Sequence, residues 1–206
     1  DVAALLPATF LHEFQHMISF NQHSLVRAGN SEERWLNEAM SHFAEELGGR
    51  LIPNSECAPT YTSCRSQYTS GDILNAYDYL KNTEAHFLVY PGASAGTLEE
   101  RGSAWLFLRW ALDQYAADTI LATATTRALV ATSLTGVANI AAVTNTSFSS
   151  MVPQWLLAIF LDDGNDLPAE PTGRLRYKSW GLRSIWTNPL NQTAFPAGFP
   201  IPVEEI

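Results

Sequence analysis

The chain has 206 residues, of which 46% are apolar, and this is enough for one sizeable domain with a hydrophobic core. The formal net charge is −9 and lysine and arginine form no run, which argues against nucleic acid or an anionic membrane as a partner. No apolar stretch reaches the roughly 18 residues needed to span a bilayer. Residues 1–4 lack the basic and apolar segments of a signal peptide.

The periodicity of apolar residues predicts a mainly α protein. Pro7 suits the first turn of the first helix, and Gly48 is expected, with Gly49, to end the second. Residues 174–186 are expected to hold one or two short strands, and the tail after them to pack as a coil through aromatic residues. In chain order, the helices are expected at about residues 7–20, 32–47, 73–81, 100–115, 119–131, 136–143 and 153–161.

The first predicted helix contains His12-Glu13-Phe14-Gln15-His16, which matches the pattern H-E-x-x-H. Residues four apart lie on one face of a helix, so the two imidazoles can converge on one metal ion. Glu13 lies beside that face and can reach a metal-bound water without being a ligand. The competing interpretation is an amphipathic helix with two surface histidines and a solvated glutamate.

The second predicted helix supplies a third ligand. Glu38, within the segment 35–39 (WLNEA), follows His16 by 22 positions, a distance that fits a helix, a turn and an antiparallel return. Glu38 then faces the two histidines and completes a His₂Glu site with an open fourth position, which is typical of catalytic zinc. We therefore expect one Zn²⁺ per chain.

The pairing of HEFQH with WLNEA resembles the gluzincin metallopeptidases, and HEFQHMI with WLNEAMSHFAEE looks closest to the hyicolysin-type secreted peptidases. Residues 102–114 and 154–163 resemble later helices of that family, so the resemblance covers roughly residues 4–163. It implies that His12, His16 and Glu38 bind zinc and that Glu13 is the general base.

The resemblance also implies two supporting residues. Asn37 matches the asparagine before the glutamate ligand, and Glu45 matches an acid that accepts the free N–H of a ligating histidine. Where thermolysin-like members carry an aspartate, this chain has His42, which favours Glu45 for orienting the histidine. A solvated Glu45 on the helix surface is the alternative.

The donor for the oxyanion is left open, because the position of the family's tyrosine holds Glu99. Tyr90 ranks first among the candidates, since it precedes a Pro-Gly connection. The other candidates are Tyr77, Tyr79, His86 and Arg101.

The resemblance implies a zincin-like pair of catalytic helices at residues 1–50, a helical C-terminal subdomain at 51–166 and an extension at 167–206 that packs on the core. The family's β-sheet subdomain, which aligns the substrate, lies before the H-E-x-x-H helix and is missing here. An upstream subdomain or a companion chain is therefore expected to complete the active site.

The function expected from these features is zinc-dependent hydrolysis of peptide or protein substrates, by a secreted endopeptidase. The alternatives are a zinc aminopeptidase of the same fold and a zinc-binding module that has lost catalysis. Glu13 argues against the inactive module, whereas the missing tyrosine argues for it.

Cys57 and Cys64 lie in a loop rich in proline, serine and threonine, where they can close a small disulfide ring. Two free thiols are the alternative. The disulfide would indicate a secreted or extracytoplasmic protein. His23 is expected to be a surface or capping residue rather than a fourth ligand, the tryptophans are expected in the core, and residues 162–166 are interpreted as a turn rather than a calcium loop.

Overall fold

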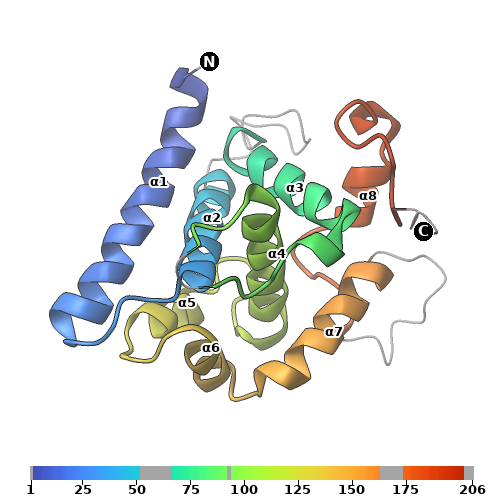
Figure 1. Ribbon diagram of the computed structural model, residues 1–206. Coiled ribbons are helices and arrows are strands. Elements are labelled where there is room, and N and C mark those ends of the chain that lie inside the picture. The colour runs from blue at the N-terminus through green and yellow to red at the C-terminus, as the bar shows by residue number, and fades with distance from the viewer. Residues whose placement is uncertain (1, 52–65, 92–93, 163–173, 202–206) are drawn as a thin grey trace.

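A computed structural model describes residues 2–51, 66–91, 94–162 and 174–201, with the side chains of 2–5 and 66 excepted (Figure 1). Cys57 and Cys64 lie outside the described residues, so the predicted disulfide stays a prediction. The described part of the chain is helical and contains no strand. Its helices are α1 (Val2–Phe20), α2 (Arg34–Leu51), α3 (Ser66–Lys81), α4 (Leu98–Tyr115), α5 (Thr123–Val130), α6 (Gly136–Thr144), α7 (Phe148–Leu161) and α8 (Leu182–Thr187).

Short helical turns connect some of these elements. A π-helix, η1 (Asn21–Val26), continues α1, and two 3₁₀ turns, η2 (Thr83–Ala85) and η4 (Pro189–Asn191), follow α3 and α8. Among the described helices, none combines the length and the hydropathy needed to cross a membrane.

Helix α4 is the centre of the fold and lies between α2 and α3 (Figure 1). Thr97 caps its start: the hydroxyl of Thr97 accepts from the backbone N–H of Glu100, and the Glu100 carboxylate accepts from the backbone N–H of Thr97. This reciprocal capping box satisfies two backbone donors that have no partner inside the helix. The capping box therefore fixes the residue at which α4 begins.

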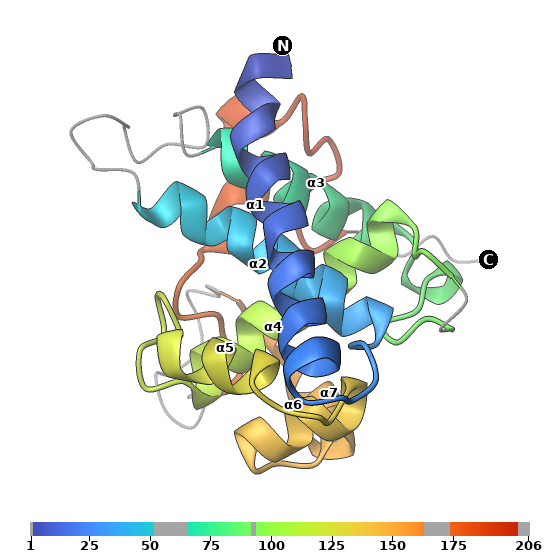
Figure 2. The same ribbon diagram turned by 90° about the vertical axis from the view of Figure 1, so that its left-hand side faces the viewer.

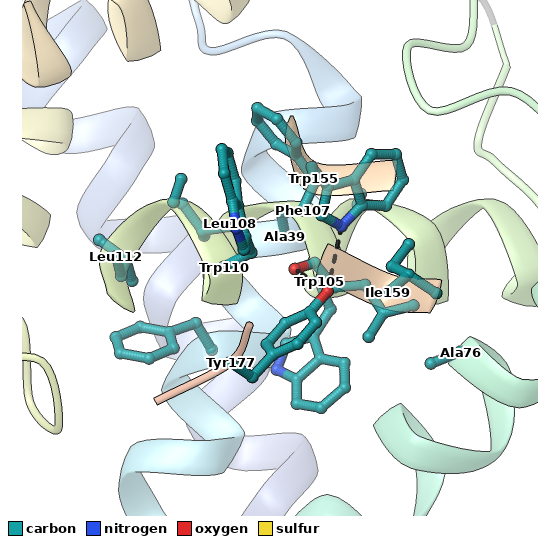
Figure 3. Packing of buried hydrophobic residues seen from close by; sticks show 14 of the residues in the cluster. Ala39, Ala76, Trp105, Phe107, Leu108, Trp110, Leu112, Trp155, Ile159 and Tyr177 are labelled. Carbon is teal, nitrogen blue, oxygen red and sulfur yellow. Dashed lines mark hydrogen bonds between the residues drawn. The ribbon is translucent and has the colours of Figure 1, made fainter. Parts of the chain in front are cut away.

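Helix α4 supplies more residues to the core than any other described helix, among them the aromatic side chains of Trp105, Phe107 and Trp110. Phe107 packs edge-on against Trp155 of α7, with ring centroids 5.6 Å apart (Figure 3). The indole N–H of Trp155 donates to the hydroxyl of Tyr177, which donates in turn to the backbone of Leu106. The expectation that the tryptophans belong to the core is confirmed for the five that are fully buried: Trp35, Trp105, Trp110, Trp155 and Trp186.

Helix α1 lies on the outside of the molecule and runs across α2 (Figures 1 and 2). The side that faces inward carries His12, Gln15 and Ser19, which are buried. The apolar residues that recur along α1 with the helical period are exposed: Phe10, Phe14, Met17 and Ile18. Helix α1 is held on α2 both by polar contacts, such as Gln15 with Ser41, and by the close approach of Leu11 to Gly48.

Two local predictions are wrong. Pro7 is not in the first turn, because α1 begins at Val2. Helix α2 does not end at the glycines but continues to Leu51. A side chain at Gly48 would meet Leu11 of α1 and Tyr68 of α3, so this glycine permits close packing between helices rather than ending one.

Residues 174–186 contain α8 rather than the strands that we predicted. Trp186 and Phe195 are buried in the common core, and Trp180 and Phe199 pack against it. The tail thus packs through the expected aromatic residues, but with a short helix. The described part of the chain offers no strand with which residues 174–186 could pair.

The crossing of α3 and α4 gives a testable prediction. A Cβ at Gly102 would lie 2.3–2.5 Å from backbone atoms of Asn75 and Ala76, so Gly102→Ala must displace α3. We expect Gly102→Ala to lower the free energy of unfolding by about 2 kcal/mol, the cost of overpacking. Gly71→Ala is the control, because nothing lies within 4 Å of its Cβ; it should stabilise α3 by about 0.5–1 kcal/mol. Urea unfolding measures both, and a Gly102→Ala variant as stable as wild type would contradict the packing.

Candidate metal centre

The three predicted ligands converge from two helices. His12 and His16 lie one turn apart on α1, and their Nε2 atoms are 3.1 Å apart. On α2, Glu38 places Oε2 3.3 Å from His12 Nε2 and Oε1 3.7 Å from His16 Nε2. Two imidazoles and one carboxylate therefore face one point.

These separations fit a zinc ion. Zinc–ligand bonds of about 2.0–2.1 Å at tetrahedral angles place neighbouring donor atoms about 3.4 Å apart. Glu38 Oε2 is buried, and His12 Nε2 and Arg101 Nη1 each lie 3.3 Å from it, so this oxygen already has groups of positive charge beside it. The two oxygens of Glu38 face different histidines, so a bidentate or slightly rotated carboxylate would serve both.

Two other groups of titratable side chains also lie close together. His12, Glu38 and His42 each place a donor atom within 4.8 Å of the others, and so do His42, Glu45 and Asp72. His12, His16 and Glu38 remain the predicted ligand set, because their donor atoms are 3.1–3.7 Å apart, near the spacing of zinc ligands.

Each histidine of the predicted ligand set has a polar partner at Nδ1. His12 Nδ1 lies 2.7 Å from Glu45 Oε1, which is the contact expected from the sequence. His16 Nδ1 lies 3.1 Å from Ser41 Oγ, and the same oxygen lies 3.4 Å from His16 Nε2. The Ser41 hydroxyl donates its one proton to Gln15, so its oxygen accepts from the ring N–H of His16. The contact with Glu45 therefore leaves Nε2 of His12 directed at Glu38, whereas Ser41 Oγ lies near both nitrogens of His16.

Sequence reasoning did not identify Ser41 or Gln15 as parts of the site. The helical period could have identified them, because Gln15 lies on the buried face of α1 and Ser41 lies about one turn after Glu38 on α2. Asn37, in contrast, is half-buried and makes no hydrogen bond through Oδ1 within the described residues.

The charges in the site are strongly coupled. Burial lowers the pKa of His12, but its hydrogen bonds to Glu38 and Glu45 outweigh burial and raise this pKa to about 9. Burial raises the pKa of Glu38, but the bond to His12 and the charge of Arg101 outweigh it, so that the net shift is downward. Without a metal, the site therefore holds a proton at neutral pH.

Two of the candidate oxyanion donors lie beside Glu38. Arg101 of α4 places Nη1 3.3 Å from Glu38 Oε2. Tyr90 is buried, its hydroxyl makes no hydrogen bond among the described residues, and its pKa is raised by burial and by the negative charge of Glu38. A hydroxyl with a raised pKa stays protonated and remains able to donate.

The other candidates have roles elsewhere. The hydroxyl of Tyr77 accepts from the backbone of Ala197, and Tyr79 stacks on Trp155 in the core. His86 lies 3.4 Å from the hydroxyl of Thr97 at the start of α4. Glu13, the predicted base, is exposed on α1 next to His12.

The expectation for His23 is wrong in part. His23 is fully buried rather than on the surface, and its Nε2 lies 3.7 Å from the buried carboxylate of Glu32. The carboxylate of Glu32 accepts from Asn139 and from the backbone of Gly136 on α6. His23 thus belongs to a polar cluster that joins η1 to α6.

No family model, curated protein or solved structure matches the chain. The resemblance of the two sequence segments to the gluzincins therefore stays a prediction.

The raised pKa of His12 predicts that zinc binding depends on pH. Because zinc displaces the proton held by His12, affinity should rise about tenfold per pH unit up to about pH 9 and then level. The sign follows from the competition: the proton is bound below the pKa and absent above it. Titration against a calibrated chelator between pH 6 and 10 measures this dependence. Affinity that stays constant from pH 7 to 9 would contradict the protonated state of the metal-free site.

Proposed function

We propose that this protein is a zinc-dependent peptidase that binds one Zn²⁺ through His12, His16 and Glu38. The observation that carries the proposal is the convergence of these donor atoms at 3.1–3.7 Å, with a further carboxylate, Glu13, adjacent to the first ligand. A His₂Glu set with an open position is the arrangement of hydrolytic zinc.

The protein residues would divide the reaction between them. When bound, zinc acts as a Lewis acid that polarises the scissile carbonyl and acidifies water. Glu13 is exposed toward solvent, where it can take the proton of the attacking water and pass it to the leaving amine. Glu45 and Ser41 keep the two imidazoles in the orientation that presents Nε2.

We further propose Tyr90 as the donor to the oxyanion, with Arg101 beside it. Burial and the charge of Glu38 keep the Tyr90 hydroxyl protonated, and this hydroxyl has no competing partner among the described residues. Arg101 contributes a positive charge at the same carboxylate. Both groups would stabilise negative charge that develops near the metal.

The expected substrate is a peptide or protein, and the enzyme is proposed to be a secreted endopeptidase, as its resemblance suggests. The outward apolar face of α1 supports the expectation of an additional subdomain or companion chain. Phe10, Phe14 and Met17 are exposed along this helix, and contiguous apolar surface of this kind commonly marks a contact with another protein unit.

The assignment of Glu13 is tested by Glu13→Gln, which keeps the size of the side chain but removes the base. We expect about one zinc per chain in both proteins and a loss of casein hydrolysis of 10²–10⁴-fold in the variant, the usual contribution of a general base. Glu84→Gln, an exposed glutamate on η2, is the control and should retain activity. Wild-type turnover by Glu13→Gln would remove Glu13 from the mechanism.

Peptide substrates with free and blocked amino termini separate the alternative functions. An endopeptidase cleaves peptides whose amino terminus is blocked, whereas an aminopeptidase requires a free terminus. Zinc binding without hydrolysis of either substrate would instead favour the zinc-binding module.

A further inference from the structure

A buried pair of titratable side chains lies on the other side of Glu45 from the proposed metal ligands. His42 of α2 and Asp72 of α3 are both buried, although neither was expected from the sequence to contact the other. His42 Nδ1 lies 2.8 Å from Asp72 Oδ1 and 3.0 Å from Glu45 Oε1. A buried carboxylate is costly unless it is paired, so Asp72 requires His42.

These contacts extend the site by two residues. From α3 inward, the polar atoms run from Asp72 to His42 at 2.8 Å, from His42 to Glu45 at 3.0 Å, and from Glu45 to His12 at 2.7 Å. The ring of His42 also packs edge-on against the ring of His12, with centroids 4.7 Å apart. A third helix is thereby linked to a residue that lies on α1.

We propose that Asp72 and His42 are positioning residues that hold Glu45, and through it His12, in the orientation that binds the metal. Glu45 has two oxygens, and the contacts to His12 and His42 both use Oε1, so the two rings fix one position of that carboxylate. Asp72 fixes the His42 ring in turn. This inference rests on the proposed metal centre, because positioning is defined by what His12 binds.

The competing interpretation is a second cation held by His42, Glu45 and Asp72, whose donor atoms lie within 4.8 Å of one another. We favour ion pairs over a second cation, because Glu45 Oε1 already lies 2.7 Å from His12 Nδ1 and because the ring of His42 packs edge-on against His12. His42 Nδ1 lies within ion-pair distance of both carboxylates, although it makes no hydrogen bond within the described residues.

The test measures zinc affinity in a double-mutant cycle with Asp72→Asn and Glu45→Gln. Asp72→Asn should raise the dissociation constant about tenfold, and Glu45→Gln 10–100-fold, the usual effect of outer partners of a ligand. The double variant should bind no more weakly than Glu45→Gln, because removing Glu45 already breaks the link. Asp78→Asn is the control: Asp78 is on the same helix, its carboxylate is paired with Lys81, and affinity should not change.

Folding of each variant is checked by circular dichroism and urea unfolding. If Asp72→Asn does not fold, His42→Phe replaces it in the cycle, since it keeps a ring against His12 and removes the nitrogen. Effects that add in the double variant would overturn the proposal, because they would show that Asp72 acts independently of Glu45. Unchanged affinity in Asp72→Asn, or a second zinc in wild type that this variant loses, would also overturn it. Wild-type protein that binds no zinc would reject the metal centre itself.

Discussion

The hydrogen bond between His12 on α1 and Glu45 on α2 is the contact on which the arrangement of the site depends. Helix α1 leaves much of its apolar surface exposed, and it packs against α2 through Leu11 at Gly48 and through two polar pairs: His12 with Glu45, and Gln15 with Ser41. In a partly buried setting such bonds are directional, and they fix the rotation of α1 about its axis. That rotation decides whether His12 and His16 face Glu38.

On its core side, helix α2 is held by a network of charged side chains around the buried Glu46. Glu46, the neighbour of Glu45, accepts from the indole N–H groups of Trp105 and Trp180 and pairs with Arg50 and Arg109. Breaking a buried pair of this kind leaves an uncompensated charge, so the network resists any rotation of α2. With Glu46 directed into the core, Glu45 is directed toward α1. The core and the site are thus coupled through adjacent residues.

Much of the site could be read from the sequence, because its geometry follows from helical spacing. His12 and His16 are one turn apart, and the segment around Glu38 has the length of an antiparallel return, so both helices and their facing sides were predictable. The contact between Glu45 and His12 was expected from the resemblance to the gluzincins, since helical spacing alone left a solvated Glu45 equally open. The contacts that could not be predicted join segments far apart in the sequence. Asp72 contacts His42 from another helix, and no local sequence pattern indicates that pairing.

The sequence misled where packing overrides local preference. Phe10 and Phe14 lie at the helical period, and in the structure they are exposed because the opposite face, which carries His12 and Gln15, is buried. Gly48 looked like a helix end but is a point of close approach between helices. Residues 182–187 form a helix within a segment where strands were expected, because Leu182 and Trp186 are buried from a helical turn.

Zinc K-edge X-ray absorption of the zinc-loaded protein would show whether His12, His16 and Glu38 bind one zinc ion. We expect nitrogen and oxygen ligands at about 2.0–2.1 Å, with outer-shell scattering from two imidazoles. In Glu38→Ala, the two imidazoles should remain and the affinity for zinc should fall. A sulfur ligand at about 2.3 Å, or a spectrum without imidazole scattering, would rule out this set of ligands.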